Sequence, residues 1–233
     1  LVIKVLAAEI EVITPIRDLN ISREDEIEYL KNQGVVMSWN KVKYSINQGL
    51  WGTSVGGKET LSSADELPNE AYPSPVKKSG SELVRIGFEQ GEPVSLNDRN
   101  MEPVKVIREL EKLASPWGAG RDVHVGDTII GIKGRVGFEA AAARILIDAH
   151  LALEKHVLTR WQLHWKEQVG QWYGMFVHEA QYLEPVMRNL ESFLESTQQN
   201  VTGVVSVRLR PYSHTVTGVY SPFDLMNASF ASY

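Results

Sequence analysis

The sequence contains no cysteine in its 233 residues. This absence excludes disulfide bonds, thiol catalysis and zinc sites with cysteine ligands. Long apolar runs are absent too, since none approaches the ~18 residues expected of a membrane-spanning helix. No segment resembles a signal peptide. We therefore expect a soluble, cytoplasmic protein with no membrane partner.

Positive charge is also in short supply. Lys and Arg number 24 against 29 Asp and Glu, so the formal net charge is −5. Domains that bind DNA or RNA usually carry a basic surface, and this balance argues against nucleic acid as the main partner. Hydrophobic residues make up 43% of the chain, which at this length predicts a sizeable core.

Three common catalytic motifs are not present in the context that their chemistry requires. The G-x-S-x-G pattern occurs at Gly52-Thr53-Ser54-Val55-Gly56, but no long helix pattern follows it, as a nucleophile elbow requires, and Gly118-Ala119-Gly120-Arg121 is only a fragment of a G-x-G-x-x-G dinucleotide motif. None of the six histidines forms H-E-x-x-H, because His178-Glu179 is followed by Ala180, Gln181 and Tyr182. We therefore predict no metal-binding residue, and no catalytic residue that acts independently.

The hydrophobic pattern predicts an α+β fold, a mainly antiparallel sheet with long helices packed on it, because strands and helices segregate instead of alternating. Expected strands are Glu9–Thr14, Val35–Met37, a hairpin over Leu83–Leu96 that turns near Gln90-Gly91, a central strand Val123–Ile132, and a hairpin of Val201–Leu209 with Thr215–Val219. Expected helices follow a capping box at Ser22, span Pro103–Ala114, run from about Glu139 to His178 with a break near Val157, and start at Pro185.

An aromatic stripe runs along the longest expected helix. Its members recur at intervals of four, four, three and four residues: Trp161, Trp165, Val169, Trp172 and Phe176. Such spacing places them on one helix face, and the stripe is interpreted as core or as a contact between subunits.

The stretch from Tyr44 to Thr60, YSINQGLWGTSVGGKET, favours a loop over a helix or a clean strand. Glycine allows the backbone to approach a ligand closely, and serine offers a donor and an acceptor from one small group. The stretch therefore suits a loop that wraps a small polar molecule. An ordinary surface loop is one alternative. A phosphate-binding loop is another, although Glu59 stands where its Mg²⁺-binding Ser or Thr belongs.

Four residues of this stretch, Tyr44, Ser45, Leu50 and Ser54, match the pattern aromatic-Ser-x-x-x-x-Leu-x-x-x-Ser. This pattern resembles the citrulline-contacting loop of argininosuccinate synthases. The resemblance continues over nearly the whole chain, for instance in the stretch Gly131-Ile132-Lys133-Gly134-Arg135. It implies the C-terminal synthetase and multimerisation half of an enzyme of arginine biosynthesis, and hence a homo-oligomer, a tetramer in that family.

The resemblance also implies a division into two parts. Residues 1–20 are expected to be the end of a preceding nucleotide-binding domain and its linker, and residues 21–233 the catalytic and multimerisation domain. The family's SGG-x-DTS and G-x-T-x-KGND segments do not occur in this sequence. In the family they hold ATP, aspartate and much of citrulline, so ATP with Mg²⁺ is expected to be bound mainly outside this chain, which by itself is expected to be inactive.

In that family the ureido oxygen of citrulline attacks the α-phosphate of ATP and expels pyrophosphate; the amine of aspartate then displaces AMP. Carried over by resemblance, the citrulline-binding residues here are Ser45, Ser54, Gly126, Asp127 and Phe138. Two of these depart from the family, which has Glu at the position of Gly126 and Tyr at that of Phe138. Either Asp127 replaces the Glu, or the partner of the substrate's ammonium group is lost and the site prefers an N-acyl-citrulline.

Two other function classes stay open at this point. The chain could be a non-enzymatic module for oligomerisation or small-molecule binding that lacks its ATP domain. It could also be a free-standing kinase built on the phosphate-loop pattern, which would bind ATP by itself.

Overall fold

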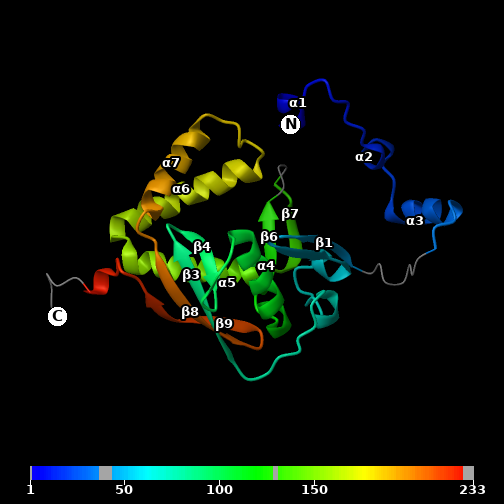
Figure 1. The fold of residues 1–233 in the computed structure, drawn as a ribbon. Helices are drawn as coiled ribbons and strands as arrows, with labels where there is room; N and C mark the ends of the chain where they lie inside the picture. Colours follow the sequence, from blue (N-terminus) through cyan, green and yellow to red (C-terminus); the bar gives the residue numbers. More distant parts are fainter. Residues whose placement is uncertain (1, 37–43, 128–130, 228–233) are drawn as a thin grey trace.

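The structure is a computed structural model that describes residues 2–36, 44–127 and 131–227. Its body contains two sheets with long helices packed beside them (Figure 1). One sheet has four strands in the order β1-β2-β7-β6, and the other has five in the order β5-β4-β3-β8-β9. Neighbouring strands are antiparallel in both sheets. The predicted α+β class is therefore confirmed.

The strands of the first sheet are β1 (Ser45–Gly49), β2 (Gly52–Gly56), β6 (Arg121–Asp127) and β7 (Lys133–Glu139). Those of the second are β3 (Glu82–Glu89), β4 (Glu92–Leu96), β5 (Arg99–Asn100), β8 (Gly203–Arg210) and β9 (Ser213–Tyr220). The helices are α1 (Val2–Leu6), α2 (Pro15–Leu19), α3 (Arg23–Asn32), α4 (Pro103–Ala114), α5 (Ala141–Val157), α6 (Arg160–His178) and α7 (Val186–Gln198). Short 3₁₀ turns include η2 (Lys58–Leu61) and η3 (Asn69–Ala71).

The main core lies between the five-stranded sheet and helices α4 and α5. Apolar side chains at helical spacing on α4 and α5 meet the inward-facing residues of β3 and β8, as period-3.6 and period-2 patterns require. The core members include Ile107, Leu110, Ile145, Leu153, Val84, Ile86, Val205 and Val207. The helix α4, the break between α5 and α6, the start of α7 and both predicted hairpins are thereby confirmed.

A carboxylate from α4 caps the start of α5. The N-cap residue Ala140 has no side-chain acceptor, and Glu111 Oε2 instead accepts a hydrogen bond from the backbone N–H of Ala142 at 2.8 Å. Burial raises the pKa of Glu111, while this hydrogen bond opposes the rise. The contact fixes α5, and with it the end of β7, against α4.

The stretch from Tyr44 to Thr60 is mostly a β-hairpin, so the prediction of a loop over its whole length was wrong. Strands β1 and β2 pair from Ser45–Gly56 to Gly49–Gly52 and are joined by the two residues Leu50 and Trp51. Gly52 has φ +145°, and a Cβ there would lie 2.6 Å from Ala140 Cβ. Glycine is thus required for close packing at the turn, and its abundance hid the strand pattern.

The predicted central strand Val123–Ile132 also needs correction. Strand β6 spans Arg121–Asp127 and, among the described strands, pairs only with β7, at the edge of the four-stranded sheet. Residues 128–130 lie outside the described part of the chain. The alternating apolar residues of β6 suggested a buried strand, but Val125 is exposed.

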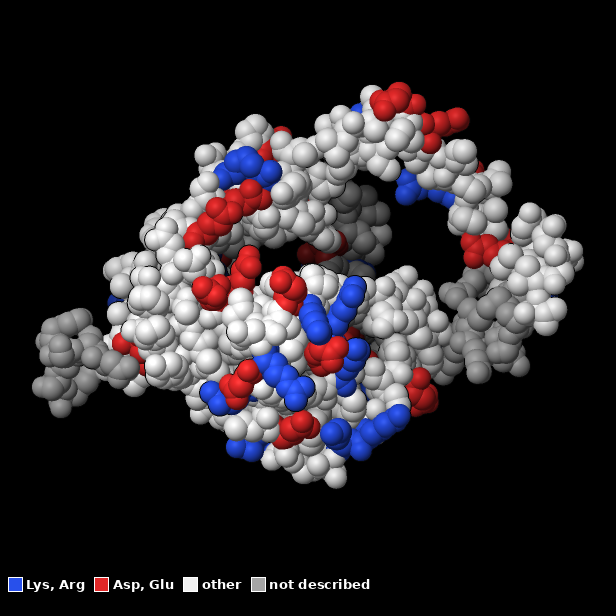
Figure 2. All heavy atoms as spheres, viewed as in Figure 1, with Lys and Arg blue, Asp and Glu red and all other residues white. Residues whose placement is uncertain are grey.

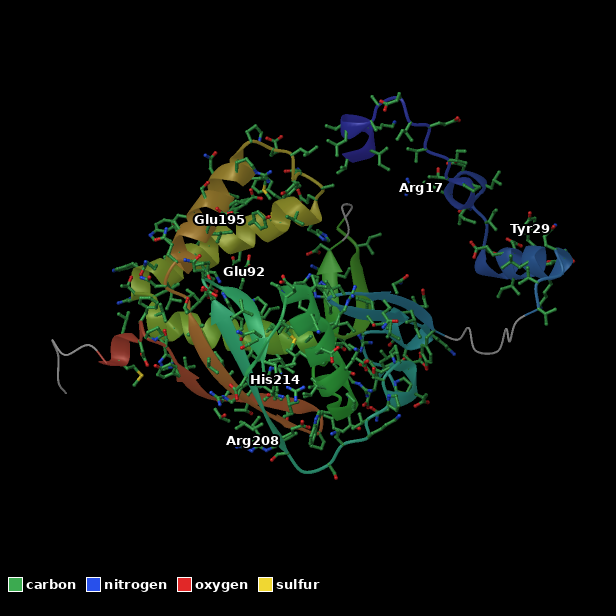
Figure 3. All side chains as sticks on the ribbon, viewed as in Figure 1. Arg17, Tyr29, Glu92, Glu195, Arg208 and His214 are labelled. Carbon is green, nitrogen blue, oxygen red and sulfur yellow. The ribbon has the colours of Figure 1, made fainter. Side chains whose placement is uncertain are left out.

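Residues 2–36 stand apart from the body (Figure 1). The predicted capping box at Ser22 is present, with Asp25 at the third helical position of α3. No strand forms over Glu9–Thr14, where the described backbone has no sheet partner, so that prediction was wrong. Val35 and Val36 are also irregular, and Met37 lies outside the described residues. Arg17 and Tyr29, labelled in Figure 3, lie on this segment and not on the body.

Helix α6 contains no buried residue, although it carries the aromatic stripe. Trp161, Trp165 and Trp172 are 63%, 57% and 56% exposed. The interpretation of the stripe as core was therefore wrong for the described chain, and the subunit contact stays a prediction.

In the described segments, every helix is too short or too polar to span a membrane. On the face shown in Figure 2, basic and acidic side chains are interspersed.

Candidate functional site

Four of the five predicted citrulline-binding residues share one face of the four-stranded sheet. Ser54 is paired with Phe138 on β7, and Phe138 with Asp122 on β6. Directly paired residues point to the same face, and so do residues two apart on a strand. Ser45 and Gly126 therefore belong to this same face, which we call the open face: Ser45, Asn47, Ser54, Asp122, His124, Gly126 and Phe138.

The open face is accessible to a ligand. Ser45 and His124 are exposed, while Ser54, Gly126 and Phe138 are half-buried. Within residues 2–36, 44–127 and 131–227, the hydroxyl groups of Ser45 and Ser54 make no hydrogen bond. Each can therefore offer a donor and an acceptor to a bound molecule.

The opposite face of the same sheet is closed by the loop that follows β2. Val55 on this face is fully buried and packs with Leu67 and Ala71. A Cβ at Gly137 would run into the end of the Leu67 side chain, so glycine at this position lets Leu67 lie close to the strand. The loop thus covers the side of the sheet that lies behind the open face.

A buried ion pair holds this loop on the sheet. Arg121 Nε lies 3.1 Å from Glu139 Oε2, and the two side chains are 7% and 3% exposed. The same guanidinium group donates to Asn69 Oδ1 at 3.1 Å and to the carbonyl of Ser74, and lies 4.4 Å from the centre of the Tyr72 ring. Burial raises the pKa of Tyr72, so its ring stays uncharged beneath the arginine. The role of Glu139 is therefore structural, because its carboxylate pairs with the buried Arg121.

A second arginine, Arg135, anchors the beginning of the loop. Its guanidinium group donates to the backbone carbonyls of Glu59 at 3.1 Å, Asp65 at 2.8 Å and Ser62. Glu59 also accepts a hydrogen bond from the Tyr44 hydroxyl at 3.3 Å. Tyr44, the aromatic residue of the loop pattern, therefore serves to position the hairpin.

Asp127 is not brought together with the other predicted site residues. It follows Gly126 on β6, so its side chain belongs to the opposite face. Its carboxylate forms an ion pair with Lys133, its partner across β7, and both side chains are largely exposed. On the open face, the described strands β1, β2, β6 and β7 carry a single acid, Asp122.

His124 was not among the predicted site residues, because the histidine spacing was considered only for metal binding. Its imidazole lies against Gly126, and a Cβ at that glycine would meet His124 Nε2 at 2.9 Å. The period-2 pattern of a strand already places residues 124 and 126 on one face. The signal was thus present once β6 was taken as a strand.

The phosphate-loop alternative does not fit the structure. Such a loop leads from a strand into a helix whose first N–H groups face the phosphates. Gly52 here begins β2 of the hairpin, and Lys58 begins a 3₁₀ turn of only four residues. This backbone cannot form the helix N-terminus that phosphate binding requires, so a kinase of this kind is excluded.

A separate cavity of about 720 Å³ lies between the β3–β4 hairpin and helices α5 and α6. Its lining is mostly apolar, but it also includes the fully buried Glu154. That carboxylate accepts from Lys166 Nζ at 2.8 Å and Gln198 Nε2 at 2.9 Å, and lies 3.7 Å from His150 Nδ1. Burial lowers the pKa of His150, which favours its neutral form beside Lys166. These groups join α5, α6 and α7.

The comparisons with known proteins point to one family. Residues 44–233 match the family model described as the arginosuccinate synthase C-terminal domain. The argininosuccinate synthase of Methanocaldococcus jannaschii is 38% identical over 99% of this chain and 59% of its own length. The enzyme of Dictyoglomus thermophilum is 37% identical over 99% of this chain and 59% of its own length. The enzyme of Pyrococcus furiosus is 36% identical over 99% of this chain and 57% of its own length. The chain thus spans somewhat less than three fifths of these relatives.

Proposed function

Because the chain belongs to the argininosuccinate synthase family, we propose that it supplies the citrulline-binding part of an ATP-dependent ligase that joins citrulline and aspartate. The ureido oxygen of citrulline attacks the α-phosphate of ATP and releases pyrophosphate. The amine of aspartate then displaces AMP and gives argininosuccinate, in the cytoplasmic synthesis of arginine. Catalysis of this kind depends on alignment of the reactants and stabilisation of charge more than on a side-chain nucleophile.

The observation that carries this proposal is the open face itself. It brings Ser45, Ser54, Gly126 and Phe138 together from strands that are far apart in the sequence. Two serine hydroxyls without a hydrogen bond in the described chain suit the neutral ureido and amino-acid groups of citrulline. The loop behind the sheet packs on its other face through Leu67 and Ala71 and is held by Arg121, which supports the strands that carry these groups.

ATP with Mg²⁺, and aspartate, are assigned mainly to the part of the relatives that this chain does not span. Within the described residues, no group of three or more His, Cys, Asp or Glu side chains could hold a metal ion. Residues 1–20 are proposed to close the preceding nucleotide-binding domain. In support, Val5, Leu6, Ile13 and Leu19 are between 62% and 77% exposed, as expected of side chains that pack on another unit.

Ser54→Ala is expected to raise the KM for citrulline about fivefold and leave kcat nearly unchanged, because one neutral hydrogen bond to the substrate is lost. Steady-state kinetics of the complete protein that contains this chain would measure both constants. Gln48→Ala is a matched control, since Gln48 is exposed on the same hairpin but points to the opposite face. An unchanged KM in Ser54→Ala would remove this serine from the site.

A second candidate function, as an oligomerisation module, is favoured by the exposed stripe on α6. Trp161, Trp165 and Trp172 occur at positions i, i+4 and i+11, so they form one apolar face that no other described element covers. We propose that a second copy of the chain covers this face. The two functions are compatible, because the stripe and the open face lie on different elements.

Light scattering tests this assembly directly. The chain is expected to have a mass in solution that is a multiple of 26.1 kDa. Trp165→Glu should reduce the mass toward that of the monomer, because it places a charge in the apolar contact. Gln171→Glu, which adds the same charge to another exposed face of α6, should leave the mass unchanged. A monomeric parent at micromolar concentration would exclude the oligomer.

The substrate is proposed more narrowly to be an N-acyl-citrulline. Asp127 points away from the open face and pairs with Lys133, so it is not positioned to hold an ammonium group beside Gly126. Phe138, which is paired with Asp122, offers the open face no hydroxyl group. A substrate whose α-nitrogen carries no charge needs no carboxylate partner, so the replacement of the family's Glu by Gly126 would not weaken its binding.

A further inference from the structure

The imidazole of His124 is the polar group that the open face presents at Gly126. The ring nitrogen Nε2 stands 2.9 Å from the place a Cβ would take at this glycine. His124 is paired with Val136 and Gly126 with Gly134, so their partners on β7 add no polar side chain there. Among the described residues of the open face, His124 is therefore the polar side chain next to the backbone of Gly126.

The charges around this point are unfavourable for an ammonium group. Asp122 is the acid of the open face, but it lies four residues from Gly126, or about 13 Å along the strand. Asp127 is closer in sequence, yet it lies on the opposite face with Lys133. An imidazole N–H can instead donate a hydrogen bond to an oxygen atom.

We propose that His124 is a specificity-determining residue that donates a hydrogen bond from Nε2 to an acyl oxygen of the substrate. The preferred substrate class is then an α-amino acid with a ureido side chain and an acylated α-nitrogen. The acyl group lies over Gly126, where the missing side chain leaves backbone exposed and His124 supplies the donor. This inference rests on the proposed function of the open face as the citrulline site.

The test compares kcat/KM for citrulline and for N-acetylcitrulline in the complete protein. The parent is expected to prefer N-acetylcitrulline. His124→Ala should lower kcat/KM for N-acetylcitrulline about fivefold through KM, and change the value for citrulline little. His124→Gln should keep most of the preference, because an amide N–H₂ group is also a donor.

Val125→Ala is the matched control, since Val125 is exposed on β6 but points to the opposite face; it should leave the ratio of the two substrates unchanged. Equal losses for both substrates in His124→Ala, or no loss, would overturn the role of His124 while the proposed function stands. A parent that prefers citrulline would overturn the acyl preference. A parent that ligates neither substrate to aspartate would overturn the proposed function as well.

Discussion

Glu139→Ala is expected to lower the free energy of unfolding by about 3–5 kcal/mol, because it leaves the Arg121 guanidinium group buried without its counter-ion. The two side chains are 7% and 3% exposed, so water cannot replace the lost carboxylate. Urea denaturation followed by circular dichroism would measure the change. The same variant should also loosen the loop around Tyr72, which hydrogen exchange of residues 69–74 would detect.

Comparison with an exposed ion pair shows how much of the expected loss comes from burial and how much from charge alone. Lys112 Nζ lies only 2.8 Å from Glu109 Oε1, but the two side chains are 72% and 42% exposed. Glu109→Ala should leave the urea midpoint unchanged, since exposed pairs contribute little. The stability loss of Glu139→Gln should fall between those of Glu139→Ala and Glu109→Ala, because an amide oxygen can still accept a hydrogen bond from Arg121 Nε. A loss in Glu139→Ala no larger than in Glu109→Ala would refute the structural role of the buried pair.

Elements whose signals are local were predicted correctly from the sequence. Helix α4 starts at Pro103 and carries its apolar residues at helical spacing, and the β3–β4 hairpin turns at Gln90 and Gly91, which both have positive φ. In each case the residues that determine the element lie within the element itself. The α+β class follows, because it depends on the order of such elements.

The β1–β2 hairpin was missed because its sequence reflects tertiary packing. Gly52 is small because Ala140 lies against it, and the polar residues of β1 face outward on an open sheet. Strand β1 therefore shows no buried residue, and in β2 the only alternation is that of Thr53 and Val55 between glycines. The edge position of β6 was hidden for the same reason, since strand order depends on partners that lie far away in the sequence.

The candidate site was predicted in part. The resemblance identified Ser45, Ser54, Gly126 and Phe138, and the sheet register places these four on one face. It grouped Asp127 with them because neighbouring residues are close in sequence, yet neighbours on a strand point to opposite faces. That same rule would have selected His124, two residues from Gly126.

Glu154→Ala is expected to lower the free energy of unfolding by about 3 kcal/mol and to release the α6–α7 pair from α5. The carboxylate is fully buried and satisfies Lys166 and Gln198 together, so its removal leaves a charged and an amide group without their partner. Helix α6 has no buried residue of its own, and this contact joins Leu163 on the main core and the Tyr173–Glu191 hydrogen bond in holding it. Urea denaturation would measure the loss, and hydrogen exchange of residues 160–178 would show whether that helix separates first.

The controls for this variant distinguish the buried carboxylate from acidity in general. Glu167→Ala removes an exposed acid beside Lys166 and should have no effect on stability. Glu154→Gln keeps an oxygen acceptor for Lys166 and should lose less than the alanine variant. Because α6 carries the stripe that is proposed to contact a second copy, Glu154→Ala should also lower the mass measured by light scattering. A variant that keeps both its stability and its mass would show that α6 is held by other contacts, and that Glu154 does not connect the body of the chain to its assembly.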